Sequence, residues 1–561
     1  MNPIFAMFEQ QVKLRPDAIA VYCGKQSVTY RQLQARAEQL RRLIPGRPGQ
    51  LVSIELDRTE DFIAAMLAVL GGEMAYLPIA SDCPQERKDF MLQDGNVFYR
   101  LIQGESGPLA VPAPDYDKDG GMYSETAYVV YTSGSTGRPK GMPILNSSVC
   151  NFIQGFCKRL PVCEGQTIAC LTTVSFDIFF IESILPLCVG MTVAMAREDE
   201  QASPGKIAGL LKRYSVDVMQ AIPSRLQILL YRDGSLACLK GLDVLMIGGE
   251  PLPLSLLQTL QTNTGARLFN LYGPTETTLW ATAAELTNAR EVTLGTPFDG
   301  YRVFVADGDL TPVSAGETGQ ICIQGPGLTP GYRNRPEQMN AHFSTGPDGE
   351  PVYLTGDLAR VGPDGALVFA GRMDNQVKIR GNRVELEEIE ACAMQVPGVV
   401  QAVAGIYEKD ADKHLCLFYM AGEEVEQAAI AAALKNKLPG YMIPSAWQRV
   451  ADFPRLPNGK VDRSGIVYQP QGQEPIQEND PLRETVKSVL AECGCSVSDL
   501  DDRKSLPELG LDSVSFVRMV VELEEAFDFE FDDAKMSFGA LPTLRALIEY
   551  LSCAAGQEVH S

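Results

Sequence analysis

Histidine is scarce in this sequence, because its 561 residues include only three: His342, His414 and His560. A Ser-His-Asp triad needs a histidine as its general base, so the scarcity argues against hydrolases of that kind. The fourteen cysteines are scattered, and no second pair or histidine cluster accompanies the closest two, Cys493 and Cys495. Neither a zinc site nor a disulfide framework is therefore expected.

Long apolar runs are absent as well. No stretch of about 18 apolar residues occurs, so no transmembrane helix is expected. The first residues lack a basic segment followed by an apolar core, which predicts no signal peptide and a cytoplasmic location. Asp and Glu number 71 against 49 Lys and Arg, a net charge of −22. This excess disfavours nucleic acids and anionic membranes as partners.

The order of apolar runs predicts several domains. Residues 1–371 alternate short apolar runs such as LVSIEL (51–56) and LDVLMIGG (242–249) with helical stretches, which favours an α/β core with buried, mixed sheets. Residues 301–325 read as antiparallel strands with tight turns, and so predict a β-rich subdomain. We expect a large domain over 1–373, a small mobile α+β domain over 374–468, a polar linker over 469–479 and a helical domain over 480–555.

The last of these domains is predicted to be an all-α four-helix bundle with its own charge. Residues 480–561 carry 17 acidic and 7 basic side chains, which indicates a separate acidic module. Its amphipathic stretches place apolar residues at helical spacing, as Leu482, Val486, Val489 and Leu490 illustrate.

A glycine-rich segment, Tyr131–Gly141, carries the sharpest local signal. Five Ser, Thr and Lys donors lie among its three glycines, directly after an apolar strand. Glycines let backbone N–H groups approach a phosphate, and hydroxyls and Lys140 supply further donors. The pattern is not a Walker A loop, because Pro139 separates Gly137 from Lys140. The alternative interpretation is a flexible solvent loop.

This segment resembles the phosphate loop of adenylate-forming enzymes, specifically the adenylation domains of nonribosomal peptide synthetases. Further motifs of that family follow in order over essentially the whole chain. They are LAVLGGEMAYLPIASDCP (67–84), NLYGPTET (270–277), YLTGD (353–357), GRMD (371–374), QVKIRG (376–381) and LPNGK (456–460).

The resemblance implies ATP and Mg²⁺ as cofactors. Glu276 would hold Mg²⁺, as a carboxylate beside a triphosphate does, although alone it reads as a solvated turn residue. Asp357 would accept from the ribose hydroxyls, and Asn270 and the segment Gly248–Glu250 would contact the adenine. The nucleotide-binding set that the resemblance implies is Thr132, Ser133, Gly134, Ser135, Thr136, Gly137, Lys140, Gly248, Gly249, Glu250, Asn270, Tyr272, Gly273, Thr275, Asp357 and Arg372.

The same resemblance assigns residues near the domain boundary. Asp374 would be the hinge about which the small domain rotates between two half-reactions. Lys460, on a Pro-Asn-Gly turn, would hold the substrate carboxylate and the α-phosphate, although alone it reads as an exposed turn lysine. The catalytic set is thus Lys460, Glu276, Thr132 and Lys140. Since catalysis then consists of positioning and charge stabilisation, it needs no histidine.

The acidic module carries its own motif, LGLDSVS (509–515). Ser513 lies at a predicted helix N-terminus and alone reads as a plain N-cap. It also resembles the attachment site of 4′-phosphopantetheine in peptidyl carrier proteins. The resemblance therefore implies a phosphopantetheinyl transferase as a partner.

The family reads its amino-acid substrate at about ten positions. Asp177 aligns with the aspartate that pairs with the substrate α-amino group. The remaining positions are Ile178, Ile181, Gln220, Met246, Gly248, Leu271, Leu279, Trp280 and Lys460. The set is similar to the glycine-type pocket, and its bulky members would fill the space of a side chain.

We therefore expect a stand-alone adenylation–carrier didomain, an amino acid ligase that forms AMP and pyrophosphate and loads itself. It would activate glycine and pass it to a condensation or other acceptor domain in trans. Alternatives are activation of alanine or another small amino acid, an acyl-CoA ligase that releases a free thioester, and a catalytically silent scaffold. Some members of the family also require a small activating partner protein.

Overall fold

The computed structural model describes residues 1–105, 107–114, 123–134, 138–232, 234–362, 365–374, 376–379, 381–409, 412–422, 425–450, 452–454, 461, 463, 466, 468, 481–495, 505–511, 513–527, 531, 541, 543, 544, 547, 548, 550 and 551. The chain divides into two compact units. One comprises Met1–Gln201 and Gly205–Glu385, and the other comprises Ala202–Pro204 and Leu386–Ser561.

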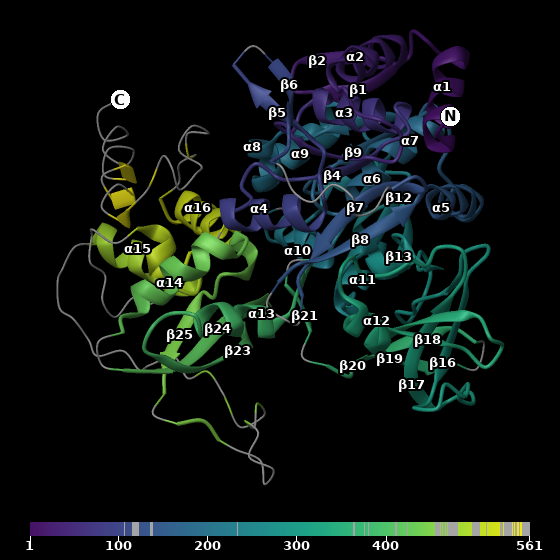
Figure 1. Cartoon of the computed structure of the whole chain (residues 1–561). Coiled ribbons are helices and arrows are strands. Elements are labelled where there is room, and N and C mark those ends of the chain that lie inside the picture. The colour runs from purple at the N-terminus through teal and green to yellow at the C-terminus, as the bar shows by residue number, and fades with distance from the viewer. Residues whose placement is uncertain are drawn as a thin grey trace, which may run out of the picture. The chain divides into compact units, whose positions relative to one another are not determined.

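The first unit contains a nine-stranded sheet (Figure 1). Its central strands are parallel and fully buried, as their continuous apolar runs predict. The order is β15 (Thr296–Pro297), β14 (Thr282–Glu285), β13 (Arg267–Tyr272), β12 (Val244–Gly248), β11 (Val218–Ala221), β9 (Thr167–Cys170), β10 (Thr192–Met195), β1 (Ile19–Cys23) and β2 (Gln26–Thr29).

A six-stranded mixed sheet supplies the segment that carries the glycine-rich loop. Its order is β6 (Gly107–Pro112), β5 (Tyr99–Gly104), β3 (Leu51–Glu55), β4 (Ala75–Pro78), β7 (Thr126–Thr132) and β8 (Lys140–Leu145). The strands β7 and β8 are antiparallel, so the loop between them closes a hairpin at the end of the sheet.

Helices cover these sheets, and α3 has nine consecutive buried residues. The C-cap of α3 is Gly72, a residue type common at helix ends. The helices of this part of the chain are α1 (Pro3–Leu14), α2 (Tyr30–Leu43), α3 (Glu60–Gly71), α4 (Gln85–Asp94), α5 (Asn146–Arg159), α6 (Ile178–Glu182), α7 (Ile184–Cys188), α8 (Glu198–Ala202), α9 (Pro204–Arg213), α10 (Pro223–Arg232), α11 (Leu254–Asn263) and α12 (Pro336–His342).

A β-rich subdomain follows within the same unit. Its antiparallel sheet has the order β16 (Arg302–Ala306), β17 (Thr318–Gln324), β19 (Pro351–Val361) and β18 (Phe343–Thr345), and β20 (Leu367–Arg372) also pairs with β19. A short hairpin of β21 (Val377–Ile379) and β22 (Asn382–Val384) comes next. The antiparallel strands predicted over 301–325 are confirmed.

The second unit contains the three-stranded sheet β23 (Val399–Lys409), β24 (Asp412–Ala421) and β25 (Ala446–Arg449), with α13 (Leu386–Ala393) and α14 (Gln427–Lys437). It also contains α15 (Pro481–Glu492) and α16 (Ser513–Phe527), whose apolar residues share one buried cluster. The fold class predicted from the sequence, an α/β core, an α+β subdomain and a helical end, is confirmed.

The domain boundaries predicted after residues 373 and 479 stay predictions. The division into compact units falls later than the first of them, between Glu385 and Leu386, and the linker 469–479 lies outside the described residues. In the part of the chain that the structure describes, no helix is both long and apolar enough to cross a membrane.

Candidate functional site

The glycine-rich loop lies between two facing residues, Thr132 at the end of β7 and Lys140 at the start of β8. The Ser133 hydroxyl donates to the Arg383 carbonyl at 2.7 Å. A Cβ on Gly134 would lie 2.0 Å from the Arg138 carbonyl oxygen, so only glycine fits there. The predicted phosphate contacts Ser135, Thr136 and Gly137 lie outside the described residues.

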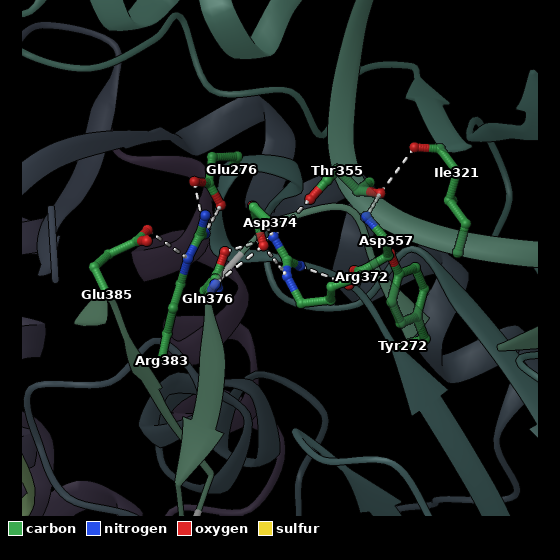
Figure 2. A network of polar contacts seen from close by, with 10 residues as sticks. All are labelled: Tyr272, Glu276, Ile321, Thr355, Asp357, Arg372, Asp374, Gln376, Arg383 and Glu385. Carbon is green, nitrogen blue, oxygen red and sulfur yellow. Dashed lines mark hydrogen bonds and ion pairs between the residues drawn. The ribbon is translucent and has the colours of Figure 1, made fainter. Parts of the chain in front are cut away.

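Beside this loop lies a buried charged cluster, which we define as Lys140, Glu276, Tyr332, Arg383 and Glu385. Arg383 Nη1 donates to both carboxylate oxygens of Glu276, at 2.8 and 2.9 Å (Figure 2). Tyr332 Oη donates to one of these oxygens at 2.7 Å. Lys140 Nζ lies 3.6 Å from Glu385 Oε1. Two cations and two carboxylates therefore offset one another in a region shielded from water.

Glu276 is ionised in this cluster. Burial alone would raise its pKa, but the charges of Arg383 and Lys140 and the Tyr332 hydrogen bond bring the pKa of Glu276 down to about 2. Burial, followed by the repulsion of Arg383, lowers the pKa of Lys140 from its ordinary value.

The donor set fits a magnesium ion carried by a nucleotide. Mg²⁺ is commonly held by one or two carboxylates together with substrate phosphates and water, and Glu276 is an ionised carboxylate beside the loop. No group of three or more potential metal-ligating side chains occurs among the described residues, so an all-protein metal cage is not seen there.

A second network surrounds Asp357 on β19. Tyr272 Oη donates to one carboxylate oxygen and Arg372 Nη1 to the other, each at 2.6 Å (Figure 2). Arg372 also makes a two-point contact with Asp374, with both distances at 2.7 Å. This contact offsets the effect of burial and lowers the pKa of Asp374. The predicted ribose-binding and hinge residues are thus joined by one guanidinium.

The residues assigned to the adenine lie at the carboxyl ends of β12 and β13. Asn270 donates to the Thr293 carbonyl at 2.8 Å. Glu250 accepts from the backbone and the hydroxyl of Ser224, at 2.9 and 3.0 Å. A Cβ on Gly273 would lie 2.6 Å from the Ala281 nitrogen, so the turn that leads to Thr275 and Glu276 needs a glycine. Ligands of open α/β sheets bind at this end of the strands.

The predicted substrate positions gather around β11 and β12. Gln220 and Met246 face each other across these strands, and Gly248 faces Leu271 of β13. Five of the positions share one buried hydrophobic cluster, with Ile178 packed against it. These five are Ile181, Met246, Leu271, Leu279 and Trp280.

Trp280 occupies the space that a side chain at position 248 would need. A Cβ on Gly248 would lie 2.8 Å from Cη2 of the indole. The turn before Trp280 is strained, because Thr278 and Leu279 have positive φ angles of 58° and 70°. Thr278 is held there by a 2.7 Å bond from its hydroxyl to the Gly327 carbonyl. The Thr278 bond therefore helps to hold the strained turn that leads into Trp280.

Asp177 lies at the start of α6 and is partly buried. Desolvation raises its pKa to about 6, although a hydrogen bond from the Thr275 side chain opposes the shift. Its carboxylate is therefore close to its titration point near neutral pH, and a cationic ligand would favour the charged form.

Sequence reasoning missed Tyr332, Arg383 and Glu385. Arg383 and Glu385 lie in the segment GNRVE, directly after the predicted motif at 376–381. Two charged residues so close to a motif of the site could have marked them as candidate site residues. Tyr332 had no comparable signal, because its partner Glu276 lies far away in the sequence. Of the predicted site residues, Lys460 lies outside the described residues, and only the backbone of Ser513, at the start of α16, is described.

Comparison with known proteins agrees with this geometry. Residues 8–333 match the family of AMP-binding enzymes, and residues 480–551 match the phosphopantetheine attachment site. This chain belongs to the AMP-binding enzyme family. It is an adenylation domain followed by a peptidyl carrier domain.

Similar proteins include the dimodular nonribosomal peptide synthase of Bacillus subtilis (strain 168), 34% identical over 98% of this chain. The chain spans 24% of the length of that synthase. Among solved structures, holo-PA1221, which contains adenylation and carrier domains and a vinylsulfonamide inhibitor, covers all of this chain and 98% of its own, with 24% identity and a TM-score of 0.82. Holo-AB3403, a four-domain nonribosomal peptide synthetase bound to AMP and glycine, is 31% identical over 98% of this chain and 42% of its own, with a TM-score of 0.61.

Proposed function

We propose that this adenylation domain activates glycine with ATP and loads it onto the 4′-phosphopantetheine of Ser513. One observation carries the choice of substrate: the indole of Trp280 fills the space against Gly248. The predicted partner of the substrate ammonium group is Asp177, an ionisable carboxylate that accepts from the Thr275 side chain. Such a site has a group for the amino end of an amino acid and little room for its side chain. The glycine bound to AB3403 supports this choice.

The first step joins the amino acid to the nucleotide. A carboxylate oxygen of glycine attacks the α-phosphorus of ATP, a new P–O bond forms, and the bond to the bridging oxygen breaks so that pyrophosphate leaves. Lys140 and the loop donate to the phosphates, Asp357 and Tyr272 hold the ribose, and Lys460 stabilises charge on the α-phosphate. Glu276 would hold a Mg²⁺ ion, which would neutralise charge on the triphosphate.

The second step transfers the acyl group. The pantetheine sulfur attacks the glycyl carbonyl carbon, AMP leaves with its oxygen, and the thiol proton is released. Asp374 is the proposed hinge for the domain rotation between the steps. Phosphopantetheinyl transferase and an acceptor domain in trans are the proposed partners.

An amino-acid-dependent ATP–pyrophosphate exchange assay tests this function. The panel contains glycine, alanine, an aryl acid and a fatty acid. The proposal predicts a dominant glycine signal. A dominant signal from another amino acid would retain the reaction and reject the pocket assignment, whereas a dominant aryl or fatty acid would favour the acyl-CoA ligase alternative.

Trp280 gives a direct test of steric selection. Trp280→Phe removes part of the indole and is expected to raise the ratio of alanine to glycine kcat/KM about tenfold, because a methyl group in a pocket is worth roughly 10- to 200-fold. The measurement is exchange with each amino acid, with thermal unfolding to establish that the variant is folded. An unchanged ratio in a folded variant would show that Trp280 does not limit the pocket.

Asp177 predicts a pH dependence. Since its pKa is about 6, protonation below that value removes the negative charge that attracts the substrate ammonium group. The kcat/KM for glycine is therefore expected to fall as pH decreases through about 6, approaching tenfold per pH unit. A profile that stays flat through this range, measured with saturating ATP, would contradict the assignment of Asp177 to the ammonium group.

A further inference from the structure

A short loop joins the two halves of the charged cluster. We call residues 328–333 the cross-link loop. Its Thr329 nitrogen donates to the Glu276 carbonyl at 2.9 Å, and the Thr329 hydroxyl donates to the Pro143 carbonyl of β8 at 2.6 Å. Its Arg333 nitrogen donates to the Gly141 carbonyl, next to Lys140, at 2.9 Å. These hydrogen bonds thus fix the distance between β8, which carries Lys140, and the turn that carries Glu276.

Tyr332 is the member of this loop whose side chain reaches both charges. Its hydroxyl donates to Glu276 Oε1 at 2.7 Å, and Lys140 Nζ lies 5.1 Å from the centroid of its ring. Tyr332 is only 5% exposed, and the rings of His342 and Phe343 pack edge-on against it. A change of χ1 would move the whole side chain and break both contacts.

We propose that Tyr332 is a positioning residue that orients the side chains of Glu276 and Lys140 to bind a metal-bound triphosphate. The hydroxyl orients the carboxylate, and the ring face offers the ammonium group a cation–π contact. This role deepens the proposed function, because it concerns the nucleotide end of the same site. Aromatic packing alone would explain a buried ring, but it would not require a hydroxyl aimed at an ionised carboxylate.

Nucleotide binding tests this role without any amino acid. Isothermal titration with α,β-methylene-ATP is performed in Mg²⁺ and again in EDTA, and the ratio of the two affinities gives the contribution of the ion. Tyr332→Phe keeps the ring and removes the hydroxyl, so this ratio is expected to fall about tenfold. Affinity in EDTA is expected to stay within about twofold of the unchanged protein.

Tyr30→Phe is the matched control. Tyr30 is fully buried and donates to the Met191 carbonyl at 2.6 Å, a partner outside the charged cluster, so loss of its hydroxyl should leave the Mg²⁺ ratio unchanged. Equal ratios in Tyr332→Phe and Tyr30→Phe would overturn the proposal. Thermal unfolding of both variants separates a change in stability from a change in metal-dependent binding.

Two further variants test the ring and the hydroxyl of Tyr332 separately. Tyr332→Leu also removes the ring, and is expected to lower affinity in EDTA at least threefold through Lys140. In a Glu276→Gln background, Tyr332→Phe should have no further effect on the Mg²⁺ ratio, because the hydroxyl acts through that carboxylate. If Tyr332→Phe lowered the Mg²⁺ ratio equally in both backgrounds, the proposal that the hydroxyl acts through Glu276 would be overturned. A failed amino-acid exchange assay would reject the glycine proposal and leave these nucleotide measurements standing.

Discussion

Ser513→Ala is expected to abolish covalent loading while amino-acid-dependent pyrophosphate exchange continues at the rate of the unchanged chain. Loading needs the serine oxygen as the attachment point of phosphopantetheine. The residues that we propose for adenylation, Lys460 included, do not include this serine. The measurement is retention of radiolabelled amino acid on the precipitated protein after treatment with a phosphopantetheinyl transferase, CoA and ATP.

Ser515→Ala provides the control. This serine lies two residues further along the same helix, α16, and its replacement is expected to leave loading in place. Retained label on Ser513→Ala would reject the carrier assignment. Loss of label from both variants would mean that the substitutions act on the fold of the carrier domain, which thermal unfolding would reveal.

Lys460→Ala is expected to lower the rate of amino-acid-dependent exchange by about 10²- to 10³-fold. The reason is electrostatic, since removal of one donor that stabilises developing charge costs about that factor in other enzymes. Steady-state exchange at saturating ATP and glycine measures it, with nucleotide binding as a second readout that should change little.

Lys435→Ala is the matched control for this variant. Lys435 is an exposed lysine on α14, and its loss is expected to leave exchange unchanged. Exchange by Lys460→Ala at the rate of the control would show that this lysine is an ordinary turn residue, as its isolated motif also allows.

Much of the fold follows from local pattern. The run at 51–56 forms β3, because continuous apolar runs bounded by turn residues are typical of buried parallel strands. The helical stretch that follows this run forms α3. Two of the predicted substrate positions, Gly248 and Leu271, are neighbours in register on β12 and β13.

The charged cluster was harder to predict. Glu276 and Arg383 lie 107 residues apart, and neither residue has a local pattern that names the other. Their pairing depends on the return of the chain through the hairpin of β21 and β22, which is a property of tertiary structure. The same holds for Tyr332, which becomes informative only when its hydroxyl is seen against a buried carboxylate.

One measurement tests the central claim, that this chain selects glycine and attaches it to its own carrier domain. The holo-protein is incubated with ATP, Mg²⁺ and an equimolar mixture of the proteinogenic amino acids, and the phosphopantetheine-bearing peptide is analysed by mass spectrometry. The account predicts a glycyl thioester on Ser513 that requires ATP. A different aminoacyl group on Ser513 would contradict the pocket assignment, and the absence of any ATP-dependent acyl group would contradict the account as a whole.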